Sequence, residues 1–178
     1  MRFEEAPLPG VWVIDVDPLT DERGWFARTF DATEFATRGL NPTVAQCNAS
    51  FNVRRNTLRG LHYQVEPHAE TKLVRCIRGA IFDVAVDLRP ESPTYRRWHS
   101  VELSSTNRRM LYLPRGLAHG FQTLTDDCEL LYLMGRDYVP GAGRGVRWDD
   151  PAFAIDWPAV VGERTISEQD RAYPDFGS

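Results

Sequence analysis

The chain has four histidines, the side chains that most readily exchange a proton near neutral pH, and two of them stand out by context. His62 lies near the end of an apolar segment. His119 follows Pro114 and Gly116, which favour a turn that returns directly into a strand. Each of these histidines, taken singly, also fits a structural role as a hydrogen-bonded core residue. Their chemistry therefore depends on the partners that the fold brings to them.

The remaining candidate groups suit proton transfer beside a carbonyl. Lys72 opens an apolar segment, Tyr132 places a hydroxyl in an otherwise apolar strand, and Asp170 could fold back from the C-terminal segment. A neutral histidine removes a proton next to a ketone when a cation stabilises the enolate oxygen and an acid reprotonates the other face. His62, Lys72 and Tyr132 fit these three roles, and a carboxylate at position 170 would fix the histidine tautomer.

A metal centre is the second chemistry that these histidines suggest. The segment 114–119, Pro-x-Gly-x-x-His, resembles the second motif of the cupin β-barrels, whose histidine points into the barrel. The first cupin motif would lie around His62, but its pair of closely spaced histidines is absent because Gln64 stands there. A metal needs three or four convergent ligands, and only His62, His119 and Glu70 can be proposed. We predict no metal and keep a metal-binding cupin as an alternative.

These residues lie on a chain whose pattern is typical of an all-β sandwich or barrel, because short apolar and β-branched segments alternate with clusters of Gly, Pro, Asn and Asp. The predicted strands are Val11–Val16, Trp25–Phe30, Val44–Phe51, Leu58–Tyr63, Lys72–Ile77, Ile81–Leu88, His99–Leu103, Arg109–Leu113, Gly120–Leu124, Glu129–Met134 and Gly145–Trp148. One short helix is predicted between a cap at Asp31 and Gly39, and another turn after Ser167. We expect residues 1–178 to form one all-β domain.

The predicted strand Val44–Phe51 shows how such a fold could build a site. Its alternation places Gln46, Asn48 and Ser50 on one face. This polar row is either a face toward solvent or, inside the mouth of a barrel, a row of hydrogen-bonding groups for a polar ligand.

Composition and charge exclude several classes of protein. The 178 residues are 42% hydrophobic and 26% charged, which is ordinary for a soluble globular chain. A net charge of −4 argues against broad binding to nucleic acid. The sequence shows neither an apolar run long enough for a membrane helix nor the pattern of a signal peptide. We therefore expect a cytoplasmic protein without nucleic-acid or membrane partners.

Eight segments, taken in order, resemble the dTDP-4-dehydrorhamnose 3,5-epimerase family. They are Asp21–Phe26, Gln46–Ser50, Leu58–Gln64, Lys72–Arg75, Asp83–Arg89, Ser92–Thr94, Pro114–Phe121 and Trp148–Pro151. The resemblance is specific because the motifs agree in both order and spacing. It implies a cupin-type jelly-roll β-barrel with few short helices, a homodimer, no metal or other cofactor, and epimerisation of a nucleotide-diphosphate-linked 4-keto-6-deoxyhexose through an enolate.

The resemblance also assigns roles to residues. It makes His62 the base, paired with Asp170, Lys72 the group that stabilises the enolate oxygen, and Tyr132 the acid on the opposite face. The substrate-binding residues that it implies are Arg23, Phe26, Gln46, Asn48, Arg59, His119 and Tyr138. Among these the two arginines would hold the diphosphate, for which guanidinium groups are well suited, and the tyrosine would stack on the base.

Three positions depart from the family pattern. Arg28 and Gly143 stand where the family usually has Glu, and Gln169 stands where a lysine is common. All three belong to outer substrate contacts, so we hypothesise that the chemistry is retained while the base or sugar of the substrate differs. Inversion at C3 or C5 alone is an open alternative, and so is a ketoisomerase built on the same barrel.

Overall fold

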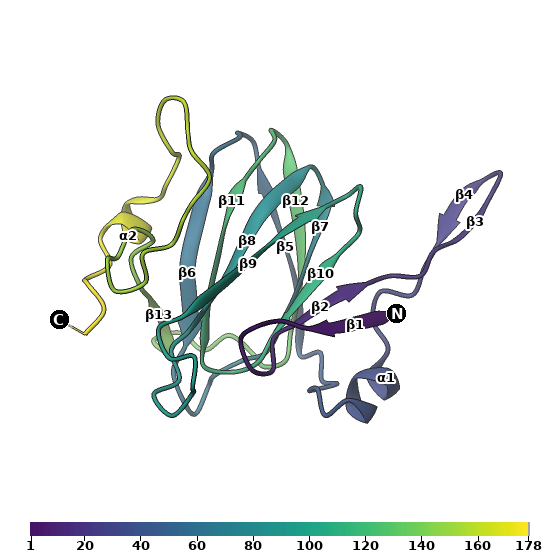
Figure 1. The fold of residues 1–178 in the computed structure, drawn as a ribbon, viewed down its shortest axis with the longest axis horizontal. Helices are drawn as coiled ribbons and strands as arrows, with labels where there is room; N and C mark the ends of the chain where they lie inside the picture. Colours follow the sequence, from purple (N-terminus) through teal and green to yellow (C-terminus); the bar gives the residue numbers. More distant parts are fainter. Residues whose placement is uncertain (178) are drawn as a thin grey trace.

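Two antiparallel sheets form the body of the computed structural model, which describes residues 1–177 (Figure 1). The strands of the first sheet are β1 (Arg2–Glu5), β2 (Trp12–Asp15), β5 (Gln46–Asn52), β7 (Lys72–Arg78), β10 (Met110–Leu113) and β12 (Cys128–Met134). Those of the second sheet are β6 (Leu58–Gln64), β8 (Ala80–Asp87), β9 (Trp98–Ser104), β11 (Leu117–Thr123) and β13 (Gly143–Gly145). The strand orders are β1-β2-β10-β7-β12-β5 and β13-β6-β11-β8-β9. The predicted all-β class is confirmed.

The main core lies between the two sheets. Side chains of β7 and β12 from the first sheet pack there against side chains of β8 and β11 from the second, among them Val74, Leu130, Ile81 and Phe121. Strand β8 is buried along nearly its whole length, because its other face packs under the C-terminal segment, where Trp157 lies. A strand that is covered on both faces needs apolar residues at successive positions, which explains why this segment is apolar apart from Asp83 and Asp87.

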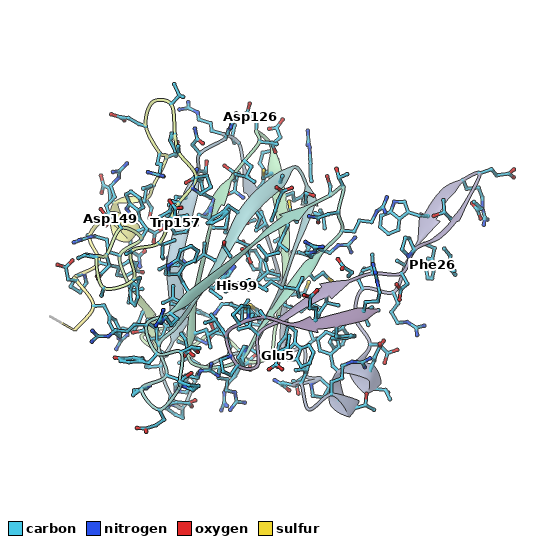
Figure 2. The ribbon with its side chains drawn as sticks, viewed as in Figure 1. Glu5, Phe26, His99, Asp126, Asp149 and Trp157 are labelled. Atoms are coloured by element: carbon cyan, nitrogen blue, oxygen red, sulfur yellow. The ribbon has the colours of Figure 1, made fainter. Side chains whose placement is uncertain are left out.

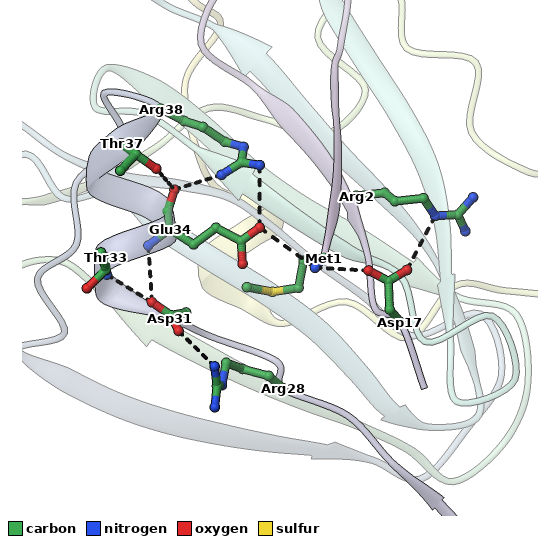
Figure 3. Close-up of polar contacts among 9 residues, drawn as sticks. All are labelled: Met1, Arg2, Asp17, Arg28, Asp31, Thr33, Glu34, Thr37 and Arg38. Atoms are coloured by element: carbon green, nitrogen blue, oxygen red, sulfur yellow. Dashed lines mark hydrogen bonds and ion pairs between the residues drawn. The ribbon is translucent and has the colours of Figure 1, made fainter. Parts of the chain in front are cut away.

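The outer face of the first sheet is partly covered by α1 (Ala32–Thr37), whose Phe35 packs on Met110 and Tyr112. The side chain of Asp31 caps this helix by accepting hydrogen bonds from the backbone N–H groups of Thr33 and Glu34 at 3.0 and 3.1 Å (Figure 3). The second helix is α2 (Glu168–Arg171), which begins after Ser167 as the sequence predicts. Among residues 1–177 no helix is long and apolar enough to cross a membrane.

A two-stranded hairpin stands apart from both sheets. It consists of β3 (Leu19–Asp21) and β4 (Gly24–Phe26), which pair only with each other and project away from the body of the molecule (Figure 1). The predicted strand Trp25–Phe30 is therefore too long, because the chain leaves the hairpin after Phe26 to reach the cap of α1.

Other predicted boundaries also need correction. The segment around His119 is part of β11, which begins at Leu117 and not at Gly120, because the turn is complete by Gly116. The last predicted strand, Gly145–Trp148, lies too late in the chain, since β13 ends at Gly145. Strands β1 and β3 were not predicted, because their sequences are short and largely polar.

Candidate active site

A cavity of about 380 Å³ lies between β5, β6, β7 and β13, beside α2. Its lining residues are Gln46, Asn48, His62, Tyr63, Gln64, Glu70, Lys72, Met134, Tyr138, Gly143, Arg144, Gln169 and Tyr173. Two of the four predicted catalytic residues, His62 and Lys72, are in this wall. The polar row of β5 contributes Gln46 and Asn48, so that row faces the cavity and is not a solvent face.

His62 forms the central pair of the site with Asp170. Its Nε2 lies 2.7 Å from Oδ1 of Asp170, across 108 residues of sequence. The second carboxylate oxygen accepts the backbone N–H of Gly60 at 3.2 Å. An imidazole that donates Nε2–H to a carboxylate keeps its lone pair on Nδ1, so this contact fixes the tautomer that can act as a base.

The position of Asp170 follows from the start of α2. The hydroxyl of Ser167 accepts the backbone N–H of Asp170 at 3.1 Å and caps the helix, which places the carboxylate against β6. Burial opposes ionisation, but the hydrogen bonds from His62, Gly60 and Ser167 outweigh it and lower the pKa of Asp170. The carboxylate therefore stays charged at neutral pH and stabilises a protonated histidine.

The strand that carries His62 approaches its neighbour unusually closely. Gly60 has a φ of +116°, and a Cβ at this position would lie 2.6 Å from the Cα of Gly120 on β11. Only glycine fits both the backbone conformation and the contact. The close contact of Gly60 with Gly120 accompanies a register shift between β6 and β11, and on this part of β6 Asp170 contacts both Gly60 and His62.

Lys72 is the first residue of β7, and its side chain is nearly buried in the cavity wall. Its ammonium group is paired with the carboxylate of Glu70. Burial lowers the pKa of Lys72, whereas attraction to Glu70 and their hydrogen bond raise it again. The ion pair with Glu70 therefore stands in the wall of the same cavity as His62.

Tyr132 and His119 lie beside the cavity and not in its lining. His119 stands directly opposite His62 in the pairing of β11 with β6, and its Nε2 is 2.8 Å from Oδ1 of Asp83. Tyr132 is opposite Asn48, and its hydroxyl lies 3.0 Å from Oγ of Ser50. The rings of His119 and Tyr132 meet edge to face at 6.3 Å. Burial raises the pKa of Tyr132, so the phenol keeps its proton at neutral pH.

The predicted binding residues divide into two groups. Gln46 accepts the backbone N–H of Tyr138 at 3.0 Å, and these two residues with Asn48 line the cavity. Arg59 donates from Nε to Oδ1 of Asn52 at 2.7 Å and lines a second hollow of about 470 Å³ that also touches His62 and Asp170.

Arg23 and Phe26, in contrast, are not brought to this cavity by their own chain. Both belong to the projecting hairpin, and Figure 2 shows Phe26 there, away from the sheets. Arg23 is paired with Asp21 of the same hairpin, and Phe26 is 71% exposed. The chain alone therefore supplies only part of the predicted binding set.

The three departures from the family pattern also lie in different places. Gly143 and Gln169 line the cavity, where Gln169 donates to the hydroxyl of Tyr173 at 3.1 Å. Arg28 lies outside the cavity and pairs with the capping residue Asp31 (Figure 3).

Sequence reasoning missed the partners of several predicted residues. Asp83 is fully buried beside His119, and burial raises its pKa while the histidine opposes that change. Its signal was a carboxylate inside the apolar run of β8. Glu70 was considered only as a metal ligand, yet it is the counter-ion of Lys72. Tyr63, Arg144 and Tyr173 have no recognisable motif and are found only from the cavity.

Metal ligation was the alternative use of these side chains. Over residues 1–177, no group of three His, Cys, Asp or Glu side chains is arranged to hold a metal ion. Each of the three proposed ligands has another partner. His62 is paired with Asp170, His119 with Asp83, and Glu70 with Lys72.

A jelly roll with an orienting carboxylate on its histidine, a buried cation and a protonated phenol nearby defines a proton-transferring enzyme of the cupin type. The chain belongs to the dTDP-4-dehydrorhamnose 3,5-epimerase family, whose profile matches residues 5–178. The predicted family and the cupin-type jelly roll are thereby confirmed.

Individual relatives agree with this assignment. A dTDP-4-dehydrorhamnose 3,5-epimerase from Methanothermobacter thermautotrophicus is 47% identical over 96% of this chain and 91% of its own length. A dTDP-4-dehydrorhamnose 3-epimerase from Streptomyces niveus is 40% identical over 96% of this chain and 82% of its own. The crystal structure of the Bacillus anthracis 3,5-epimerase, with TDP and PPi bound, has a TM-score of 0.93 at 35% identity and covers 98% of this chain and 99% of that one.

Proposed function

We propose that this protein is an epimerase that inverts C3, C5 or both in a nucleotide-diphosphate-linked 4-keto-6-deoxyhexose during deoxysugar biosynthesis. The observation that carries the proposal is the contact of 2.7 Å between His62 and Asp170 in the wall of a cavity that also holds Lys72. Family membership supplies the substrate class, since relatives named for this reaction match nearly the whole chain.

In the proposed reaction His62 removes the proton next to the keto group through Nδ1. Asp170 remains charged and stabilises the imidazolium that forms. Lys72 donates a hydrogen bond to the oxygen of the enolate, where the negative charge develops. Tyr132, which lies on the sheet opposite that of His62, returns a proton to the other face of the carbon. Because the new proton arrives on the face opposite the one from which the first proton was removed, the configuration of the carbon is inverted.

Exchange in deuterated water tests this function. The 4-keto-6-deoxy sugar nucleotide is incubated with enzyme in D₂O, and NMR follows loss of the C3 and C5 protons. We expect exchange with inversion at one or both carbons, and a loss of at least about 10²–10⁴-fold in His62→Ala, the usual contribution of a positioned base. Absence of exchange with any nucleotide form of the sugar, or an undiminished rate in His62→Ala, would contradict the proposal.

Inversion at C3 alone is the second candidate. It is favoured by the 40% identity to a 3-epimerase over 96% of the chain, which is close to the identity to several 3,5-epimerases. The same NMR experiment separates the two, because a 3-epimerase leaves the C5 configuration unchanged. A product whose carbonyl has moved would indicate the ketoisomerase alternative.

The substrate nucleotide is proposed to be dTDP, as in the relative that holds TDP. Tyr138, 62% exposed at the cavity rim, would stack on the base. Gly143 and Gln169 leave this rim without the side-chain charges that are usual in the family, so preference among dTDP, UDP, CDP and GDP forms is tested by titration of each nucleotide.

A homodimer is proposed as the working form, with the hairpin of one subunit completing the cavity of the other. The hairpin exposes Leu19 and Phe26, and β5, the last strand of its sheet, exposes Phe51 with Val53 beside it. An apolar arm and an apolar edge on one monomer fit a second copy of the chain. Arg23 and Phe26 would reach substrate by this route.

Sedimentation tests the association directly. We expect twice the 20.3 kDa chain mass for the wild type and a shift toward monomer in Leu19→Asp. Val161→Asp, at a fully exposed apolar residue outside the hairpin, serves as the control and should stay dimeric. A monomeric wild type at micromolar concentration would contradict the proposal. The cytoplasmic location stays a prediction.

A further inference from the structure

Lys72 is the only lysine among the 21 lysine and arginine residues of the chain. Its side chain is 11% exposed, and that of its partner Glu70 is 4% exposed. The ammonium pairs with Oε1 of the carboxylate, while Oε2 is buried and has no hydrogen-bond partner. A half-satisfied ion pair thus lies in the wall of the cavity.

Such a pair is a poor device for stability. Two buried charges lose their hydration, and apolar residues of similar size stabilise a fold at least as well. The unpaired Oε2 adds the cost of a desolvated acceptor. The pair is therefore better explained by what it does in the cavity than by what it adds to the fold.

The surroundings of Lys72 show what Glu70 contributes. Burial favours the neutral amine, and Glu70 is the only carboxylate that lines the cavity in the described part of the chain. The strands beside β7 place Leu113 and Met134 opposite the lysine, and both are uncharged. The other titratable groups of the cavity are His62, Tyr63, Tyr138, Arg144 and Tyr173. None of these is anionic at neutral pH, so Glu70 alone in this cavity favours the ammonium form.

We propose that Glu70 is a positioning residue that keeps Lys72 protonated and fixed at the cavity wall, ready for the oxygen on which charge develops. The inference rests on the proposed epimerase function for its purpose, because a charged lysine stabilises an enolate oxygen more strongly than a neutral amine does. Its physical core, the coupling between Glu70 and the protonation of Lys72, is independent of any substrate.

The first experiment measures that coupling without substrate. Because the chain has one lysine, protein labelled with ε-¹³C lysine gives a single resonance, whose chemical shift against pH reports the protonation of Lys72. We expect the midpoint to fall by about one pH unit or more in Glu70→Gln. Glu66→Gln is the matched control, since Glu66 is an exposed carboxylate in the same loop, and its midpoint should stay at the wild-type value.

Equal midpoints in the wild type and Glu70→Gln would overturn the proposal. Should the glutamine variant not fold, Glu70→Asp provides a second test, because the shorter side chain withdraws the charge from the ammonium. Its midpoint should fall in the same direction by a smaller amount. Since no substrate is present, failure here is distinct from failure of the proposed function.

The second experiment is the pH profile of exchange. Loss of the counter-ion should move the basic limb of kcat/KM toward lower pH, with a deficit of about tenfold or more at pH 8.5 and about threefold or less at pH 6.5. In a Lys72→Arg background, where residue 72 stays charged, Glu70→Gln should leave the basic limb in place. A loss that is equal at every pH is what a merely structural role predicts, and it would refute the inference.

Discussion

Two carboxylate–histidine pairs stand side by side in this fold, and they differ in exposure. His62, paired with Asp170, has a side chain that is 46% exposed, whereas His119, paired with Asp83, is 6% exposed. The exposed ring can reach a substrate carbon. The buried one is in edge-to-face contact with Tyr132. This difference in exposure supports His62 as the base. The contact with Tyr132 indicates that His119 helps to position the ring of that tyrosine.

Tyr132→Phe separates removal of the proton from its return. The variant retains His62 and Lys72, so we expect exchange of the substrate proton with D₂O to continue within about tenfold of the wild-type rate, while inversion falls by about 10²-fold or more. Proton NMR gives the exchange and the configuration of the product in one experiment. Tyr112→Phe removes another buried phenol, on the outer face of the sheet, and should affect neither. Inversion at the wild-type rate in Tyr132→Phe would show that another group is the acid.

At this scale the sequence predicted residue types better than contacts. His62, Lys72 and Tyr132 could be proposed from their chemistry, and the polar row of β5 from its alternation. The pairing of His62 with Asp170 could be offered from chemistry and was assigned by the family resemblance. Their contact itself could not be read from spacing, because 108 residues separate them and no local pattern encodes their meeting. The counter-ion role of Glu70 depends on burial, which the sequence around it does not show.

The elements position these side chains through a local feature of β6, the close contact of Gly60 with Gly120 on β11. Segments with strong signals were predicted well, such as β8, which is apolar at most positions, and α1, whose ends carry a cap and a glycine. The pairing of β11 with β6 was not predictable, because the register shift between His119 and Phe121 follows from contact between glycines on different strands.

Gly60→Ala should disturb the close contact of β6 with β11. The added Cβ would lie 2.6 Å from the Cα of Gly120 and 2.8 Å from the carbonyl oxygen of His119, so the strands must separate. We expect the free energy of unfolding to fall by about 2–4 kcal/mol, from backbone strain plus the clash, and kcat/KM to fall at least about tenfold as His62 moves from Asp170. Urea unfolding and the exchange assay measure the two effects.

Gly162→Ala is the matched control for that variant. Gly162 has a φ of +92° but has no atom within 4 Å of an added Cβ. It should therefore show backbone strain alone, about 1–2 kcal/mol, with activity unchanged. Equal losses in the two variants would mean that contact between the strands is not what requires glycine at position 60.

Asp87 at the end of β8 fixes the next loop and gives the fold an acid-sensitive contact. Although burial opposes its ionisation, hydrogen bonds from Arg89, Ser92 and Thr94 lower its pKa to about 2. A carboxylate with a depressed pKa stabilises the fold above its ordinary pKa of 3.8, and this contribution is lost as the pH falls through about 2.

Asp87→Asn should therefore lower the free energy of unfolding by roughly 2–3 kcal/mol at pH 7, and the difference from wild type should shrink between about pH 4 and pH 2. Urea unfolding at a series of pH values measures it. Asp156→Asn, at an exposed position, is the control and should leave the profile unchanged. A deficit in Asp87→Asn that is constant across this range would assign the effect to packing and not to charge.

At the scale of the whole molecule, the projecting hairpin is the feature that a single chain does not explain. It carries two residues of the predicted binding set and contributes none of the residues that line the cavity. The sequence predicted the residues but not their separation, because a strand pattern shows which side chains alternate and not where a hairpin points. The separation is what an exchange of arms between two subunits would resolve.

Mixing two defective proteins tests that exchange. One variant is His62→Ala, with an intact hairpin, and the other combines Arg23→Ala and Phe26→Ala, with an intact His62. Each alone should be nearly inactive. If the hairpin acts in the partner's cavity, random reassociation gives half heterodimers, each with one intact site out of two, and about a quarter of wild-type activity returns. If the hairpin served its own subunit, every site in the mixture would carry a defect and no activity would return.

The reciprocal mixture provides a second, matched test. Wild type is mixed in equal amount with a chain that carries all three substitutions. With exchanged arms, both sites of every heterodimer are defective, so about a quarter of the activity remains, from wild-type homodimers alone. If each hairpin acts in its own subunit, each heterodimer retains one wild-type site. About half of the activity of an equal total amount of wild type then remains. Exchanged hairpins thus predict equal activity in the two mixtures, about a quarter in each, whereas hairpins that act in their own subunit predict none in the first mixture and about half in the second.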